Sequence, residues 1–463
     1  MARLALPEHA SRRHLFALAW PVMAANFLQT FATFVDLLMV GHLGAVEGKT
    51  AVNAVGAASL VVFFNFSVMI AISAGTIALV SRSIGAGDPA AASRATKQSL
   101  LLGFLVSLPL AAVEGVFAED LMRLVTTGNL KPEVVLAGAA YLRVLVPVMP
   151  LFFSLFLASA AFRGAGDTRT PLYVGVGLNL VNFTINLLLI FGLAGFPRLG
   201  VVGAAVGTAI ATGLAGAAYL VLLARGRSGL RVNWRGGLDR DLARRLLRVG
   251  LPAGIESVLF QVGITLWVAM VSVYGDSAYA AHVIGLRVQS LAFMPGIGLS
   301  VAASALAGQY LGARRPEEAE HSAREAAKLA ILVMGSIALV NFVAAPWIAA
   351  AFGADAPTQA LTVLFIRIHA LSIPAVGLYF TFEGALKGAG DTRYPLLTSI
   401  VGIFVVRLPL AFVLGFGVAS PGVPWWVPLG LTGIWFSLPV EYLVRSALIS
   451  RRFRSGRWKS LAV

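Results

Sequence analysis

Long apolar runs dominate this sequence, and short segments rich in Arg, Gly and Pro separate them. A helix crosses the roughly 30 Å hydrocarbon layer of a membrane with about 20 apolar residues, and in lipid every backbone N–H and C=O group needs an internal partner. The alternating pattern of a membrane β-barrel is not found. We therefore predict an all-α integral membrane protein with twelve transmembrane helices, at 14–41, 52–80, 98–118, 134–160, 172–193, 201–224, 249–274, 283–307, 329–352, 362–386, 396–417 and 429–450.

The second half of the chain repeats the first. The segment from Phe162 to Pro171 returns as Leu386 to Pro395, with Gly-Ala-Gly-Asp-Thr-Arg inside both, and other matching positions keep the shift between 224 and 231 residues. Six spans in each half leave both halves in the same orientation, so they are parallel repeats related by an axis along the membrane normal. We predict an N-lobe at 1–224, an Arg-rich cytoplasmic connector at 225–248, and a C-lobe at 249–463 that ends in a basic cytoplasmic tail.

Composition and charge fit a membrane protein. The chain is 58% hydrophobic and 12% charged, against about 45–50% and about 25% in soluble domains. Of the 36 Lys and Arg residues, 27 lie on the same face of the predicted membrane as the N-terminus, and 4 lie on the opposite face. Because positive residues accumulate in cytoplasmic segments, we predict that both termini are cytoplasmic in a multi-pass protein of the cell (inner) membrane. The net charge of +15 then reflects topology rather than nucleic-acid binding.

The first apolar run precedes no cleavage signal and is about twice as long as the core of a secretory signal, so we expect a permanent span. The absence of Cys excludes disulfides, thiol nucleophiles and Cys-ligated metals. The six His residues have no paired ligand spacing, and no GxxxxGK[ST] motif indicates ATP hydrolysis. We expect no enzyme activity and no cofactor. Parallel repeats are typical of secondary transporters, with a channel or a structural membrane protein as the alternative.

Several motifs occur in a fixed order along the chain: Asp36 to Gly41 (DLLMVG), the twin GAGDT segments, Ala281 to Gly285 (AHVIG) and Phe293 to Gly296 (FMPG). Together with the repeat and the twelve spans, they resemble the multidrug and toxic compound extrusion (MATE) family of prokaryotes over nearly the whole chain. The resemblance implies a V-shaped pair of six-helix lobes, a monomer, and export of amphipathic, often cationic drugs in exchange for H⁺ or Na⁺.

Two other functions are alternatives. A flippase for lipid-linked precursors would come from the same superfamily, but it needs a basic cavity, and few Arg residues lie mid-membrane. An integral-membrane transferase would need carboxylates or His residues clustered at one membrane face. Asp167 and Asp391 instead lie in identical Gly-rich segments, which are typical of turns between helices.

Polar residues inside the first six spans form a candidate coupling site. Asp36 lies in the outer half of the first span, and Asn182 and Asn186 are one helical turn apart at the same depth. Tyr141 and Thr208 reach this level from two other spans. Ionisable residues in a membrane are costly and usually functional, and a buried carboxyl group can hold a proton. A purely structural hydrogen-bonding role is the alternative for each residue.

The resemblance points to the same positions as the cation-coupling site, with Na⁺ at Asp36, Asn182, Asn186 and Thr208 as the alternative to H⁺. Some relatives have Asp at the position of Asn186. Asn there removes one negative charge, which favours a single proton. Pro21 lies fifteen residues before Asp36 in the same span, and because proline removes a helix hydrogen bond, we expect a hinge there or a helix start.

The C-lobe lacks this set. Trp267 stands at the repeat position of Asp36, and Val406 and Leu410 replace the two Asn residues. Arg407 and Glu441 lie at similar depth in neighbouring antiparallel spans, so we expect them to form an ion pair that is either structural or substrate-facing.

The remaining polar residues in the spans are candidates for a substrate cavity. They are Asn26, Gln29, Gln261, Gln289 and Glu256, beside the predicted ion pair. The tenth span has no mid-span Asp. Within the resemblance, this favours the DinF-like branch, with its proton-coupled site in the N-lobe, over the NorM-like branch.

Overall fold

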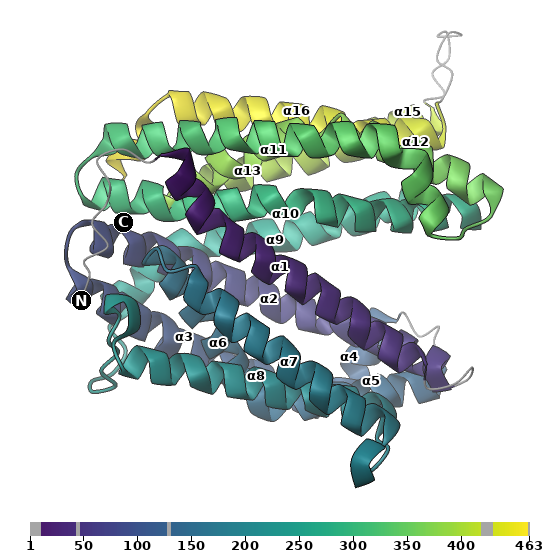
Figure 1. Ribbon diagram of the computed structural model, residues 1–463, viewed down its shortest axis with the longest axis horizontal. Helices are drawn as coiled ribbons and strands as arrows, with labels where there is room; N and C mark the ends of the chain where they lie inside the picture. Colours follow the sequence, from purple (N-terminus) through teal and green to yellow (C-terminus); the bar gives the residue numbers. More distant parts are fainter. Residues whose placement is uncertain (1–10, 43–46, 127–130, 418–428, 462–463) are drawn as a thin grey trace. The chain divides into compact units, whose positions relative to one another are not determined.

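The computed structural model describes residues 11–42, 47–126, 131–417 and 429–461. The regular structure in this part of the chain is all helical, without a β-strand. The predicted all-α fold class is therefore confirmed. The main helices (Figure 1) are α1 (Arg12–Gly41), α2 (Glu47–Gly85), α3 (Pro89–Val116), α4 (Ala118–Val125), α5 (Pro132–Leu145), α6 (Met149–Gly164), α7 (Arg169–Phe191), α8 (Gly200–Ala224), α9 (Arg240–Ser272), α10 (Asp276–Gly312), α11 (Pro316–Ala351), α12 (Ala356–Ala370), α13 (Ile373–Gly388), α14 (Arg393–Ile400), α15 (Leu408–Phe416) and α16 (Leu431–Arg454).

Each of the twelve predicted spans overlaps one helix or one pair of consecutive helices. Among the described residues, ten helical segments are long and apolar enough to cross a membrane, and the pair α12–α13, bent by 48°, makes an eleventh. The remaining helix, α16, covers the predicted span 429–450. Its central turns carry Glu441 and Arg445, whose charges lower its mean hydropathy.

The chain divides into two compact units, each of which packs mainly within itself. We call Ala24–Gly254 the N-unit, and Met1–Met23 together with Ile255–Val463 the C-unit. The boundaries fall inside α1 and α9, each two residues after a proline within the helix, Pro21 or Pro252. The predicted lobes follow the duplication of the sequence, whereas these units follow packing in space, and the lobes at 1–224 and 249–463 stay a prediction.

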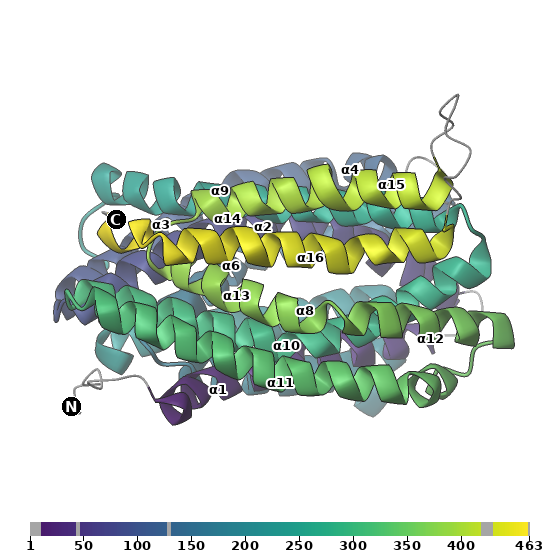
Figure 2. The same ribbon diagram turned by 90° about the horizontal axis from the view of Figure 1, so that it is seen from above.

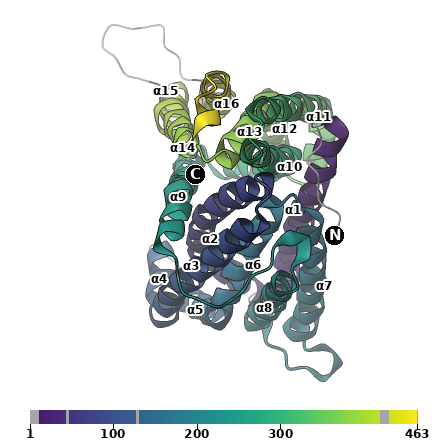
Figure 3. The ribbon, with the colours of Figure 1, turned by 90° about the vertical axis from the view of Figure 1, so that its left-hand side faces the viewer.

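The N-unit is one bundle. Its helix α2 packs against α3, α5 and α6, and α8 packs against α5, α6 and α7 (Figure 3). Small residues bring these helices close together, as is usual in membrane bundles. A Cβ atom on Gly216 would lie 2.5 Å from the carbonyl oxygen of Leu151, and one on Gly203 would lie 2.7 Å from that of Leu189. Because these glycines lack side chains, α8 approaches α6 and α7 at backbone distance.

The C-unit is centred on α10, which packs against α11, α12 and α13 (Figure 2). On its other side α13 packs against α16. Large aromatic side chains fill this core, and Trp267, Phe365, Tyr379 and Trp435 are each at most 1% exposed. The core therefore combines bulky rings with a close backbone approach between α13 and α10 at Gly384.

The twin GAGDT segments form turns between helices, α6 to α7 and α13 to α14. The second glycine of each turn has a positive φ angle, 85° at Gly166 and 89° at Gly390, a conformation that glycine adopts without steric cost. Asp167 accepts a hydrogen bond from a backbone N–H in the first turn of α7 at 2.9 Å. Asp391 pairs with Arg452 at 2.7 Å. Both carboxylates thus have structural partners.

Candidate functional site

The N-unit brings the predicted coupling residues into contact. Asn186 on α7 donates a hydrogen bond from Nδ2 to Oδ1 of Asp36 on α1, at 2.7 Å, and a second to Oδ1 of Asn182, at 3.2 Å. Asn182 in turn donates to the hydroxyl of Thr208 on α8, at 3.3 Å. The two Asn side chains are buried, at 5% and 0% exposed. We call Asp36, Asn182, Asn186, Thr208 and Tyr141 the Asp36 cluster.

The amide of Asn182 can serve Asp36 in two orientations. With its nitrogen turned toward Asp36, Asn182 donates to both carboxyl oxygens at 3.1 Å. In the opposite orientation its oxygen takes that place, and its nitrogen reaches Thr208. Tyr141 on α5 is hydrogen-bonded to Thr208 and lies near Asp36. The cluster therefore joins one carboxyl group to two amides and two hydroxyls.

A glycine on α8 makes room for the cluster. A Cβ atom on Gly207 would lie 1.9 Å from Oδ1 of Asn186, so only glycine leaves space for this amide between α7 and α8. The hydroxyl of Thr208 also donates to the carbonyl oxygen of Ala204 one turn earlier, at 2.9 Å. This bond holds the Thr208 oxygen in place, with its lone pairs directed at the cluster.

The other candidates in the first span lie apart from this cluster. Pro21 lies within α1 and is buried, Asn26 is half-buried, and Gln29 is exposed. The helix continues through Pro21 for nine further residues on its N-terminal side, so this proline is not a helix start. The predicted hinge at this position stays a prediction.

The C-unit contains the predicted pair of Arg407 and Glu441, which are 2% and 0% exposed. The Glu441 carboxylate also accepts a hydrogen bond from Nη1 of Arg445, one turn along α16, at 3.2 Å. Arg407 stacks on Trp267, with its guanidinium carbon 5.1 Å from the ring centroid. Trp267, at the repeat position of Asp36, donates its own N–H to the carbonyl oxygen of Ile434 at 3.2 Å.

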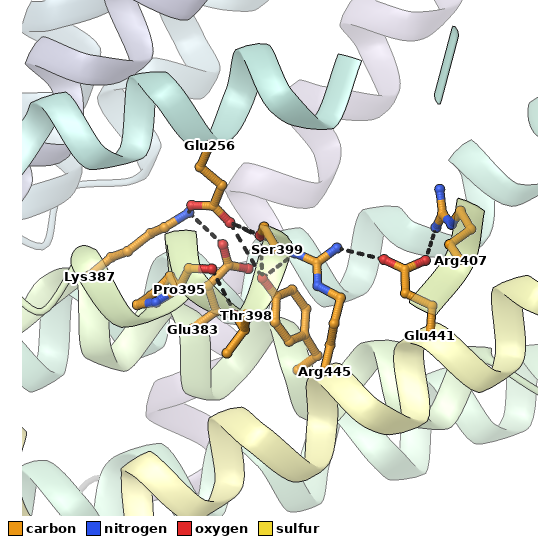
Figure 4. Close-up of polar contacts among 10 residues, drawn as sticks. Glu256, Glu383, Lys387, Pro395, Thr398, Ser399, Arg407, Glu441 and Arg445 are labelled. Carbon is orange, nitrogen blue, oxygen red and sulfur yellow. Dashed lines mark hydrogen bonds and ion pairs between the residues drawn. The ribbon is translucent and has the colours of Figure 1, made fainter. Parts of the chain in front are cut away.

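A second group of charges continues from Arg445 (Figure 4). Lys387 pairs with Glu256 on α9, with 2.9 Å between Nζ and Oε2, and with Glu383 on its own helix α13. Ser399 on α14 donates to Oε1 of Glu256 at 2.6 Å and accepts from Nη2 of Arg445 at 2.6 Å. Ser399 thereby connects the two groups.

We call the three Glu residues and three basic residues of these two groups the C-unit ion network. Its members are Glu256, Glu383, Lys387, Arg407, Glu441 and Arg445. Their formal charges cancel. Removing charges from water is costly, and only good geometry and further hydrogen bonds offset that cost. The Tyr379 ring, 4.1 Å from the Arg445 guanidinium carbon, and the Ser399 hydroxyl add such contacts.

Sequence reasoning identified parts of this network but not its connection. Arg407, Glu441 and Glu256 were candidates. Lys387 counted only toward the charge bias, and Arg445 was one of the basic residues within the spans that had no predicted role. A signal was present, because Glu383 with Lys387 and Glu441 with Arg445 each stand four residues apart, the spacing of ion pairs on one helix face. Gln261 and Gln289 are half-buried, and the amide oxygen of Gln289 is buried without a hydrogen bond.

The donor chemistry of the Asp36 cluster suits a proton or a small hard cation. Among the described residues, no group of three or more His, Cys, Asp or Glu side chains could hold a metal ion. A carboxylate, amide oxygens and hydroxyls are oxygen ligands of the kind that hard cations prefer. Only one member of the cluster carries a formal charge.

A helical fold that spans a membrane, with a carboxyl cluster in one unit and a neutralised ion network in the other, is typical of membrane transporters. The MatE family model matches residues 21–188 and 252–413, once in each half of the chain. The chain belongs to this family. The two matches begin 231 residues apart, which lies within the shift of the repeat.

The chain is also similar to individual relatives over nearly its whole length. It is 31% identical to the "Probable multidrug resistance protein NorM" of Thermotoga maritima, covering 98% of this chain and 94% of the relative. It is 28% identical to the "Probable multidrug resistance protein YoeA" of Bacillus subtilis, covering 93% and 90%.

Solved structures share the fold. A crystal structure of MATE in the straight conformation matches with a TM-score of 0.86 at 20% identity, covering 96% of each chain. The outward-facing conformation of a multidrug resistance MATE family transporter matches with a TM-score of 0.83 at 20% identity, also covering 96% of each chain.

Proposed function

We propose that this protein exports amphipathic, often cationic organic compounds across the cell membrane in exchange for H⁺, using the Asp36 cluster as the coupling site. The observation that carries the proposal is the hydrogen bond from Asn186 to Asp36, within a set of two buried amides and two half-buried hydroxyls. No basic side chain among the described residues pairs with Asp36. Its carboxyl group is therefore free to gain and lose a proton.

The Asn182 amide offers a partner for both states of Asp36. An ionised carboxylate accepts hydrogen bonds only, and it suits the orientation in which the Asn182 nitrogen donates to both of its oxygens. A protonated carboxyl group has a hydroxyl donor, and it suits the opposite orientation, in which the amide oxygen accepts. Proton loading at Asp36 thus changes the hydrogen bonds between α1 and α7.

A change at Asp36 has a mechanical route along α1. Pro21 removes one backbone hydrogen bond in the same helix, and kinks in helices commonly occur at proline. We propose that α1 bends near Pro21 when the Asp36 cluster changes partners. Alternating access in transporters built from repeats requires such a rearrangement.

The single formal charge of the cluster favours H⁺ over Na⁺, because Na⁺ binding gains strength from each additional carboxylate. In the C-unit, all three carboxylates of the ion network already have cationic partners. This distribution supports coupling from the N-unit alone, as in the DinF-like branch, although the relatives described above carry the name NorM or YoeA.

The flippase alternative requires a positive site for a phosphate-bearing cargo. The buried Arg407 and Arg445 would be the candidates, but each contacts the Glu441 carboxylate. Neutralised guanidinium groups favour export of uncharged or cationic compounds instead. We further propose that the protein is a monomer with both termini in the cytoplasm and that it catalyses no reaction.

Uptake measurements in proteoliposomes test the coupling. Purified protein is reconstituted, a pH gradient or a Na⁺ gradient is imposed, and accumulation of the amphipathic cation ethidium is followed. Wild type is expected to respond to the pH gradient and Asp36→Asn to lose this response while still folding. Asp355→Asn, at an exposed carboxylate whose side chain caps no helix N–H, should behave as wild type.

The same assay separates the hinge from the coupling group. Pro21→Ala leaves the Asp36 cluster intact and should slow ethidium uptake while keeping its response to the pH gradient. Proton-driven accumulation that persists in Asp36→Asn would overturn the coupling proposal. A response of wild type to Na⁺ alone would overturn the choice of ion.

A further inference from the structure

A basic cavity lies in the N-unit, away from the Asp36 cluster. It is formed by the first turns of α3 and by residues 225–239, which we call the connector loop, and its volume is about 510 Å³. Arg94 and Lys97 line it from α3, and Arg231 and Arg235 line it from the connector loop. Ser93 and Asn233 add hydrogen-bonding groups, and none of the lining residues is acidic.

The connector loop is held against α3 by side chains on one face of that helix. Ser93 accepts a hydrogen bond from the backbone N–H of Arg231 at 3.0 Å, and Lys97 donates to the carbonyl oxygen of Arg235 at 2.5 Å. Gln98 both donates to the carbonyl oxygen of Gly237, at 3.2 Å, and accepts from a further backbone N–H of the loop, at 2.9 Å. The four cationic side chains therefore project from a fixed backbone.

One acidic group, Asp88, pairs with a lining residue but offsets only one of the four charges. Asp88 lies 3.9 Å from Arg94, and its other oxygen accepts the backbone N–H of Ala91 at the start of α3. Four positive charges thus face one carboxylate, which pairs with Arg94 and leaves the other three lining cations in excess. A cavity of this volume falls in the range of about 300–1,000 Å³ that holds small ligands, and guanidinium groups match the geometry of phosphate oxygens.

The depth of the cavity indicates which anion would meet it. The third predicted span begins at residue 98, directly after Lys97. This prediction places the cavity where the hydrocarbon layer ends and the lipid headgroups begin. Trp234, between two lining residues of the loop, is 48% exposed. Trp side chains are enriched at this level of a membrane.

We propose that this cavity binds the phosphate headgroup of an anionic phospholipid, with Arg94, Lys97, Arg231 and Arg235 as its ligands. The bound lipid fastens the connector loop to α3 and to the membrane surface. This site is separate from the proposed export function and does not depend on it. A general excess of positive charge at the membrane surface would attract anionic lipids but would not depend on these particular side chains.

Thermal unfolding of the purified full-length protein in detergent, titrated with phosphatidylglycerol or with zwitterionic phosphatidylcholine, tests the proposal. Wild type should unfold at a higher temperature with phosphatidylglycerol than with phosphatidylcholine. The double variant Arg231→Gln/Arg235→Gln should bind phosphatidylglycerol about 25-fold more weakly, from about fivefold for each charge lost near a membrane surface.

The matched control removes two charges from the neighbouring exposed surface of α9, Arg240→Gln/Arg244→Gln, neither of which lines the cavity. It should keep the wild-type response. Equal loss in both double variants, or no loss in the cavity variant, would overturn the proposal in favour of diffuse attraction. Stabilisation by inorganic phosphate to the same extent would overturn the choice of a lipid. Unfolding temperatures in phosphatidylcholine show whether each variant is folded.

Discussion

Glu441 is the carboxylate shared by the two arginines of the C-unit ion network. It is 0% exposed and contacts both Arg407 and Arg445. Glu441→Gln keeps the shape of the side chain but leaves two buried guanidinium groups without their shared carboxylate. Breaking a buried ion pair in this way costs about 3–5 kcal/mol. We expect a correspondingly lower unfolding temperature of the purified protein, measured by thermal denaturation in detergent.

An exposed pair provides the control for this prediction. Asp241 and Arg245 on α9 are 2.9 Å apart and mostly exposed, and surface pairs of this kind contribute about 0–1 kcal/mol. Asp241→Asn should therefore unfold close to wild type. If Glu441→Gln unfolds at the same temperature as this control but loses transport, the network faces substrate instead of stabilising the fold.

Contacts between individual residues also show how far a site can be predicted from a sequence. The contact of Asp36 with Asn186 and the pair of Arg407 with Glu441 followed from depth along neighbouring spans. The contact of Glu256 with Lys387 did not, because both residues lie near span ends, where a charge is ordinary. Depth places residues at one level, but the rotation of each helix decides which of them touch.

Two glycines on α13 determine how closely it approaches α10. A Cβ atom on Gly384 would lie 2.2 Å from the carbonyl oxygen of Ser300, and one on Gly388 would lie 2.0 Å from that of Ser304. Both glycines and both serines are four residues apart, so the two helices touch along one face over a full turn. Spacing of this kind is common where membrane helices pack backbone to backbone.

Gly388→Ala should force α13 away from α10, since the clash is with backbone and no flexible side chain can move aside. Overpacking of this kind costs about 1–3 kcal/mol, and thermal unfolding of the purified variant measures it. Gly335→Ala on α11 is the control, because its added Cβ would meet nothing within 4 Å. It should be neutral or stabilising by up to about 1 kcal/mol. Equal stability of the two variants would contradict the close packing.

One helical segment of the C-unit could not be predicted from hydropathy. Between α14 and α15 the chain forms a π-helical segment, Val401–Arg407, which ends at the buried arginine. Such a segment holds more residues per turn than an α-helix and often occurs at functional sites. Relative to a regular helix, the segment rotates the side chains that follow it, from Leu408 onward. The prediction from the sequence treats this stretch as part of one uniform span.

At the scale of the whole molecule, the two halves share a fold but not their polar chemistry. The N-unit holds a carboxyl group with neutral partners, whereas at the matching position the C-unit holds Trp267 beside a buried arginine. The family model matches each half once. Duplication therefore accounts for the common architecture, and the different residues at the matching positions account for the single candidate coupling site.

The predicted orientation of the molecule can be tested by single-cysteine labelling, because the chain has no Cys of its own. Leu238→Cys in the connector loop and Phe196→Cys between α7 and α8 both replace exposed side chains. In intact cells a membrane-impermeant maleimide should label position 196 and not position 238. Permeabilised cells, in which both positions should react, serve as the control, and the reverse pattern in intact cells would place the termini outside.

The sequence by itself determined the twelve helical segments, the duplication, the charge bias and the presence of a carboxyl group in the first span. All of these features can be read from the order of residues along the chain, because hydropathy and charge at each position determine which segments enter lipid. Only the tertiary structure decided that an Asn182 amide meets Asp36, that Lys387 neutralises Glu256, and that the compact units divide inside α1 and α9. These contacts depend on helix rotation and on distances of about 3 Å between atoms far apart in the chain, which no local pattern specifies.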